Sequence, residues 1–194
     1  MKNNVLIFAT NNQHKIEEIR SVIGNQFKIV TLKEAGIDFD IPEPHDTIEG
    51  NASEKSKTIF NLTKQNCFSE DTGLEVEALN GEPGVKSARY DGDKKNFDAN
   101  IDKLLTKLNG INNRVAQFKT VVSLMWYEKE YLFEGITKGN IIHERKGSNG
   151  FGYDSVFIPE GSNKTFAEME LAEKNLYSHR RKATDKLLEF LKRQ

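Results

Sequence analysis

Two adjacent carboxylates, Glu70 and Asp71, are the side chains of this sequence best placed to do chemistry. They follow an apolar pair and precede Thr72-Gly73, at what the pattern predicts to be the end of a strand. Neighbouring side chains on a strand point to opposite faces, so we expect a turn at Gly73 to end the strand and let both carboxylates face one ligand. Carboxylates grouped in this way suit a hard cation such as Mg²⁺, which often bridges to phosphate. The alternative is an Asx-type turn whose acids are solvated.

A polar turn near the start of the chain is a second candidate site, for an anion. It lies between an apolar run at residues 5–9, which predicts a buried strand, and a helical isoleucine pattern over residues 15–23. A helix N-terminus presents free N–H groups and the positive end of the helix dipole. Thr10 and Asn12 would add donors and Lys15 a charge, and the alternative is an ordinary capped helix. Neither GxGxxG nor GxxxxGK[ST] occurs, which excludes the dinucleotide fingerprint and the Walker P-loop.

The elements that must position these groups alternate between helix and strand in the first half of the chain. The second half carries a predicted antiparallel hairpin, with Glu128-Lys129 as its turn. This mixture predicts an α/β fold with a mixed β-sheet flanked by helices, in one domain over residues 1–194. The further expected strands are 27–32, 115–127, 130–137 and 155–158, and the further expected helices are 47–66, 93–109 and 178–192.

Composition excludes several classes of protein. The 194 residues suffice for one substantial domain, and a formal net charge of −1 provides no basic field for tracking a nucleic-acid backbone. The first apolar run is too short for a signal peptide or a membrane span, and no later run approaches spanning length. The single cysteine, Cys67, fits a reducing compartment. We therefore expect a cytoplasmic protein that binds neither nucleic acid nor membrane.

Several short motifs, taken in order, resemble the inosine triphosphate pyrophosphatase (Ham1-like) family. Each is weak alone, but together they run from Val5 to the last predicted helix. The chain departs from the family where Glu70 stands for a frequent Asp, Asn11 for a frequent Gly, and Gly50 for a usual acid, and we assign Gly50 no role. The matching segments are Thr10–Lys15, Glu43, Asn51-Ala52 with Lys55, Glu70–Leu74, Gly81–Gly84, Ser87–Tyr90, Phe151–Asp154 and Ser178–Arg180.

The resemblance implies a Mg²⁺-dependent enzyme. Its expected substrates are purine nucleoside triphosphates with a deaminated base (ITP, dITP and XTP), cleaved to the monophosphate and pyrophosphate. The implied fold has two lobes with a central cleft, and the implied assembly is a homodimer. Two alternatives stay open: a Maf-like pyrophosphatase that acts on other nucleotides, and a nucleotide-binding sensor without turnover.

Roles for individual residues follow from the same resemblance. Glu43 and Asp71 are the expected metal ligands, and Asp71 is the expected base that activates water, with Glu70 sharing either task. Lys174, His179 and Arg180 are candidate donors to the O6 atom of the base, although O6 is also present in guanine. Phe151 would stack on the purine; the alternatives are a core aromatic at Phe151, a surface lysine at Lys174, and helix caps at His179 and Arg180. Substrate contacts are implied for Thr10, Asn11, Asn12, Gln13, His14, Lys15, Lys55, Thr72, Phe151, Gly152, Tyr153, Asp154, Lys174, His179 and Arg180.

Overall fold

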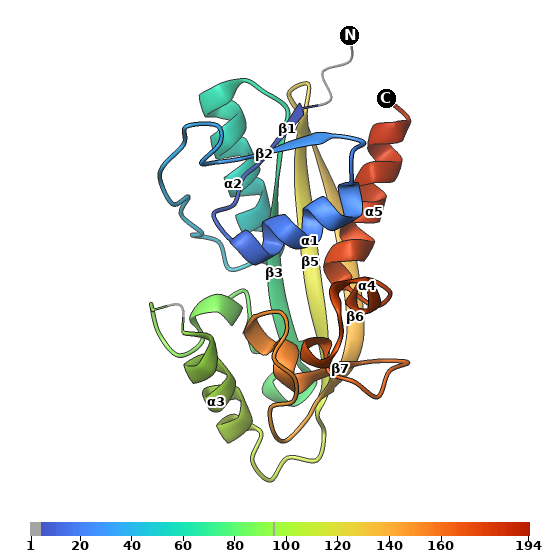
Figure 1. Cartoon of the computed structure of the whole chain (residues 1–194). Coiled ribbons are helices and arrows are strands. Elements are labelled where there is room, and N and C mark those ends of the chain that lie inside the picture. Colours follow the sequence, from blue (N-terminus) through green and yellow to red (C-terminus); the bar gives the residue numbers. More distant parts are fainter. Residues whose placement is uncertain (1–4, 95) are drawn as a thin grey trace. The chain divides into compact units, whose positions relative to one another are not determined.

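The computed structural model describes residues 5–94 and 96–194 (Figure 1), and these residues divide into two compact units. The first unit contains the residues up to 71, residues 120–135 and residues 180–194, and the second contains residues 72–119 and 136–179. Among the described residues, no helix is long and apolar enough to cross a membrane.

The elements divide between the units as follows. The first unit holds β1 (Val5–Phe8), α1 (Gln13–Ile23), β2 (Lys28–Thr31), α2 (Ile48–Thr63) and nearly all of α5 (His179–Lys192). The second unit holds β4 (Pro83–Gly84), α3 (Phe97–Lys107), β7 (Phe157–Pro159), α4 (Leu171–Lys174) and four short 3₁₀ turns. Three long strands contribute residues to both units: β3 (Cys67–Val76), β5 (Val115–Trp126) and β6 (Lys129–Ile141).

The sheet is mixed, as the sequence predicted. Within the described residues its strand order is β2-β1-β3-β5-β6-β7, and β4 pairs with β3. Strand β1 runs parallel to β2 and β3, whereas β4 runs antiparallel to β3 and β7 antiparallel to β6. The parallel pairs come from the strand-helix-strand half of the chain, because a parallel connection needs a crossover segment.

Alternating side chains of β1 and β3 divide the core of the first unit into two layers. Leu6 and Phe8 pack with the isoleucines of α1 and the leucines of α5, and Phe68 stacks on Phe8 at 4.5 Å between ring centroids. Ile7 and Cys67 point the other way and pack with α2. Helices α1 and α5 therefore cover one face of these strands and α2 covers the other (Figure 1). Burial raises the pKa of the Cys67 thiol to about 12.

The second unit has its own core. Helix α3 buries Ile101 and Leu104 in one cluster with Leu74 of β3 and with aromatic side chains. Phe118 of β5 meets Phe157 of β7 edge to face, at 4.8 Å between centroids. Each unit therefore buries a substantial apolar cluster of its own.

The most consequential difference from the prediction concerns β3. It does not end at Gly73 but continues to Val76, and its last part pairs with β4. The predicted turn at Gly73 was wrong because the pairing of Leu74 with Gly84 holds this segment extended. The real turn lies in the following residues, where Asn80 and Gly81 adopt positive φ.

Smaller differences concern element ends. Helix α3 begins at Phe97 rather than at residue 93, because the Asn96 side chain caps it by accepting a hydrogen bond from Ala99 N–H. The hairpin turn is Tyr127-Glu128 rather than Glu128-Lys129, and both of its residues adopt the positive φ that a two-residue hairpin turn favours.

Truncation of Ile59 should test the α2 side of the core. Ile59 is fully buried, so Ile59→Ala is expected to lower the free energy of unfolding by about 2–5 kcal/mol through lost burial and a residual cavity. Leu62→Ala, on the same helix at a position 58% exposed, should change it by less than about 0.5 kcal/mol. Urea denaturation followed by circular dichroism measures both, and equal effects would contradict the assigned packing of α2.

Candidate active site

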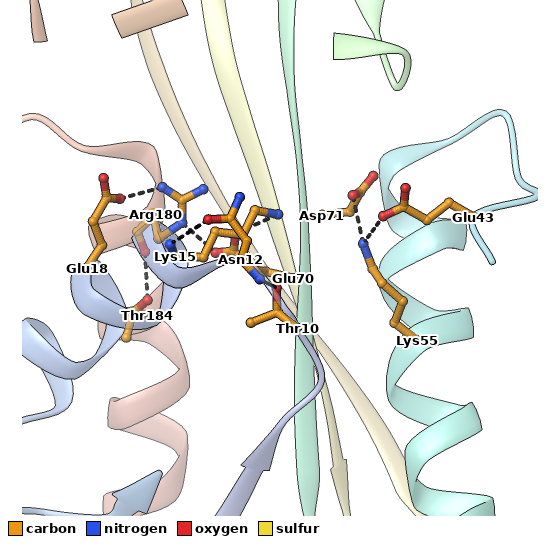
Figure 2. Close-up of polar contacts among 10 residues, drawn as sticks. All are labelled: Thr10, Asn12, Lys15, Glu18, Glu43, Lys55, Glu70, Asp71, Arg180 and Thr184. Carbon is orange, nitrogen blue, oxygen red and sulfur yellow. Dashed lines mark hydrogen bonds and ion pairs between the residues drawn. The ribbon is translucent and has the colours of Figure 1, made fainter. Parts of the chain in front are cut away.

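Glu70 and Asp71 point to opposite sides of β3 (Figure 2). Their separation follows from the strand geometry, because Glu70 shares the face of Phe68 whereas Asp71 shares the face of Cys67. Glu70 therefore faces α1 and α5, and Asp71 faces α2. The expectation that both carboxylates turn to one ligand was wrong, and it failed because the strand continues past them.

Lys55 of α2 bridges Asp71 to Glu43, which lies on the loop before the helix (Figure 2). The Lys55 ammonium lies 2.7 Å from Glu43 Oε1 and 2.9 Å from Asp71 Oδ1. Burial would lower the pKa of Lys55, but the charges of Asp71 and Glu43 raise it. Burial also raises the pKa of Asp71, although Lys55 and Lys15 oppose that shift. Two carboxylates around one ammonium leave one net negative charge at this point.

The carboxylate pair suits Mg²⁺. Among the described residues there is no group of three or more His, Cys, Asp or Glu side chains arranged to hold a metal ion. Mg²⁺ does not need such a group, because it is usually bound by one or two carboxylates together with substrate phosphates and water. Glu43 and Asp71 are therefore the residues that fit this ion, with oxygen ligands and a net negative charge.

Asn51 fixes the loop that carries Glu43. Its side-chain amide accepts a hydrogen bond from His45 N–H at 2.9 Å and donates one to His45 C=O at 3.1 Å. Lys55 follows Asn51 by one helical turn, so the same face of α2 holds both the backbone of the loop and the Glu43 carboxylate. A β-carbon at Gly50 would lie 2.7 Å from His45 Cβ. The absence of an acid at this position therefore lets the loop lie directly against the helix.

Glu70 takes part in a buried chain of charges with α1 and α5 (Figure 2). Its Oε1 lies 3.0 Å from the Lys15 ammonium, and its Oε2 accepts a hydrogen bond from Arg180 Nε at 2.7 Å. The same guanidinium donates through Nη1 to Glu18. Burial would raise the pKa of Glu70, but Arg180 and Lys15 lower it to about 2. Burial would lower the pKa of Arg180, but Glu70 and Glu18 raise it.

The start of α1 carries the helix cap of the alternative interpretation, although Lys15 is paired with Glu70 rather than solvated. Asn12 is the N-cap residue, and its Oδ1 accepts a hydrogen bond from Lys15 N–H at 3.2 Å. Thr10 Oγ1 accepts one from Asn12 N–H at 3.2 Å. Asn11 is exposed and donates to Asp40 at 2.9 Å. Gln13 and His14 are exposed on the first turn.

Lys174 and Asp154 form a buried ion pair in the second unit, at 2.7 Å. The Lys174 ammonium also lies 5.6 Å from the centroid of the Phe151 ring and 5.4 Å from that of Phe166. Asp154 accepts a hydrogen bond from Phe151 N–H at 2.9 Å, which ties the start of the Phe151–Asp154 motif to the ion pair. A β-carbon at Gly150, where φ is +74°, would lie 2.1 Å from Asp154 Oδ2. Lys174 is therefore not the surface lysine of the alternative interpretation.

The remaining predicted residues lie in or beside this cluster or on β3. His179 stacks on Phe118, with ring centroids 4.6 Å apart and planes at 12°. The Tyr153 hydroxyl donates to Ser87 C=O at 3.0 Å, so this buried side chain braces the loop of the Ser87–Tyr90 motif. Gly152 has positive φ, as residues in tight loops often do. Thr72 follows Asp71 on β3 and is half-buried.

Glu18 is the charged residue of this site that the sequence analysis missed. It lies on the helix predicted over residues 15–23, one turn after Lys15, and an acid at such a position is ordinarily solvated. Its contact with Arg180 joins residues 162 positions apart, so no local pattern reports it. The available signal was its spacing of three from Lys15, which places both side chains on one side of the helix.

Known proteins resemble this chain over nearly its whole length. A dITP/XTP pyrophosphatase of Flavobacterium psychrophilum is 51% identical over 187 residues, which cover 96% of this chain and 98% of the relative. A dITP/XTP pyrophosphatase of Porphyromonas gingivalis is 49% identical and covers 96% of each chain.

Solved structures agree with the fold. The Ham1 protein of Staphylococcus aureus superposes with a TM-score of 0.88 at 40% identity, covering 97% of this chain and 98% of that one. A HAM1 protein of Coxiella burnetii gives a TM-score of 0.89 at 32% identity, covering 98% and 99%. The model of the Ham1 family matches residues 6–190. On this sequence and structural evidence, the chain belongs to the Ham1 family.

Proposed function

We propose that this protein hydrolyses dITP, XTP and ITP to the nucleoside monophosphate and pyrophosphate, and so removes deaminated purine nucleotides. The observation that carries the proposal is the convergence of Glu43 and Asp71 on the Lys55 ammonium, because it combines a carboxylate pair suited to Mg²⁺ with a cation suited to phosphate. The similarity to proteins named dITP/XTP pyrophosphatase supports the choice of substrate.

The first unit supplies the groups for the triphosphate. Thr10, Asn12 and Lys15 surround the N-terminus of α1, where N–H groups and the helix dipole favour an anion. Glu43 and Asp71 would hold Mg²⁺, which when bound offsets the negative charge of the phosphates and stabilises the charge that develops in the transition state. Lys55 adds a positive charge next to both carboxylates.

Asp71 is the proposed general base. It would accept a proton from the water molecule that attacks the α-phosphorus, as the new P–O bond forms and the bond to pyrophosphate breaks. A raised pKa makes a carboxylate a stronger base, and the burial of Asp71 raises its pKa. Glu70 lies on the other face of β3, so we assign it a supporting role and leave proton transfer to Asp71.

We assign base recognition to the second unit. Lys174 and His179 provide donors for the O6 atom of hypoxanthine or xanthine, and Phe151 provides a ring for stacking. Adenine carries an amino group at this position, so a donor would face a donor. A buried polar site can reject such a mismatch by roughly 10⁴–10⁵-fold. Arg180, held between Glu18 and Glu70, is kept as a proposed substrate contact.

Glu70 is proposed as a permanent anion that keeps Lys15 and Arg180 in place. With a pKa of about 2, its carboxyl group is ionised at neutral pH. The homodimer implied by the family resemblance and the cytoplasmic location expected from the composition are further proposals, and they do not bear on these roles.

A substrate panel tests the proposed function. Pyrophosphate release should be fast with ITP, dITP and XTP in Mg²⁺ and slow with ATP and GTP, and EDTA should abolish it because the phosphates then lack their counter-ion. Faster turnover of dTTP or UTP would instead favour a Maf-like enzyme. Nucleotide binding without any pyrophosphate release would favour a sensor.

Asp71→Asn should remove the base and one metal-binding charge while keeping the shape of the side chain. We expect kcat for ITP to fall by roughly 10²–10⁴-fold. Asp98→Asn, at a side chain that is 87% exposed, is the matched control and should leave kcat unchanged. An Asp71→Asn variant that folds and retains near-normal kcat would refute the assignment of Asp71.

Stability at acid pH tests the assigned charge of Glu70. Its pKa falls from 4.5 to about 2 on folding, so between these values the unfolded chain binds a proton that the folded chain does not. The free energy of unfolding should therefore drop by about 3 kcal/mol as the pH falls through this window, on account of Glu70. Glu70→Gln should remove this drop in the free energy of unfolding, whereas Glu160→Gln, at an exposed position, should leave it unchanged. Denaturant titrations at several pH values measure the slopes, and equal slopes for all three proteins would contradict the assignment.

A further inference from the structure

We propose that Glu18 is a positioning residue for the reaction, acting through Arg180 on Glu70 and Lys15. The inference rests on the proposed function, because Lys15 and Arg180 are proposed substrate contacts. It assigns a role to a carboxylate that lies outside the matching sequence motifs.

The contacts form an unbroken line from Glu18 to Lys15 (Figure 2). Glu18 Oε2 accepts a hydrogen bond from Arg180 Nη1, and the Nε of the same guanidinium donates to Glu70 Oε2 at 2.7 Å. The other oxygen of Glu70, Oε1, lies 3.0 Å from the Lys15 ammonium. The line thus crosses from α1 to α5, then to β3, and back to α1 one turn earlier.

Burial makes this arrangement sensitive to the loss of one member. Glu18 is 7% exposed, Arg180 2% and Glu70 1%, so water can replace little of what a removed partner provides. The four charges alternate in sign and sum to zero when Glu18 is present. Without Glu18, these four residues would contain two cations, Lys15 and Arg180, and a single carboxylate, Glu70. A buried charge that loses its partner is strongly unfavourable, so the remaining groups would rearrange.

The rearrangement would reach the proposed phosphate site. Each oxygen of Glu70 contacts a different cation, so a guanidinium that turns fully toward Glu70 competes directly with Lys15. Lys15 also sits in the first turn of α1, whose cap is Asn12. With Glu18 present, the Arg180 guanidinium binds two carboxylates, Glu18 and Glu70. Oε1 of Glu70 then remains in contact with Lys15 and orients it.

Steady-state kinetics with ITP and Mg²⁺ test the inference. Glu18→Gln should lower kcat/KM by roughly 10–100-fold, the usual effect of removing a group that orients a primary contact. Glu18→Asp keeps the charge and should recover part of the loss. Glu189→Gln is the matched control, because it breaks an exposed Glu–Arg pair at the end of α5, and it should leave kcat and KM unchanged.

A double-variant cycle separates positioning from a general effect on folding. If Glu18 acts through Arg180, then Glu18→Gln should have little further effect in an Arg180→Gln background, and the double variant should lie within about 3-fold of Arg180→Gln. Independent losses that multiply in the double variant would overturn the inference, as would a Glu18→Gln enzyme with the kcat and KM of the control.

The cycle stays informative if Glu18→Gln alone fails to fold. The double variant removes both members of the pair and leaves no lone guanidinium, so its kcat/KM can still be compared with that of Arg180→Gln. Equal values support the inference, and a further loss of about 10-fold or more overturns it. Turnover of ITP by the wild type tests the proposed function separately. An inactive wild type would overturn both the proposed function and the role of Glu18. An active wild type whose kinetics do not change on Glu18→Gln would overturn the role of Glu18 alone.

Discussion

Successive side chains of β3 point to opposite sides of the strand, and in the first unit each side meets a different helix layer. Two acids that are adjacent in the sequence therefore lie in different surroundings. Asp71 meets α2 and its lysine, whereas Glu70 meets α1 and α5. The different ion-pair partners of the two carboxylates follow from this alternation.

The two sides differ in their charge balance, and the difference suits their proposed tasks. On the α2 side, two carboxylates outweigh one ammonium, which leaves an attraction for a cation. On the α1 and α5 side, Lys15, Glu70, Arg180 and Glu18 balance one another, which favours a fixed geometry. Burial raises the pKa of Asp71, whereas two cations hold the pKa of Glu70 near 2. Neighbours in sequence thus receive different proposed roles, Asp71 as the reactive group and Glu70 as a structural one.

Local patterns in the sequence predicted most of the fold. Helix spacing located α1, α2 and α5, and β-forming runs located β5 and β6, because these signals depend on residues close in sequence. The end of β3 was misplaced because its continuation depends on pairing with β4, which no local signal reports. For the site, the family resemblance nominated residues such as Lys174 and Asp154, which the structure brings into one ion pair. Glu18 and the loop-holding role of Asn51 escaped prediction, since both depend on contacts that form only in the folded chain.

The deep position of Cys67 has a practical consequence. It is the one cysteine of the chain, it lies fully buried between β3 and α2, and its thiol has a pKa of about 12. The thiolate is the reactive form toward maleimides and disulfides, so this side chain is protected both by burial and by protonation. A cysteine engineered at any exposed position would therefore carry a fluorophore or spin label almost alone. Labels for distance measurements between the two units could therefore be introduced without first replacing Cys67.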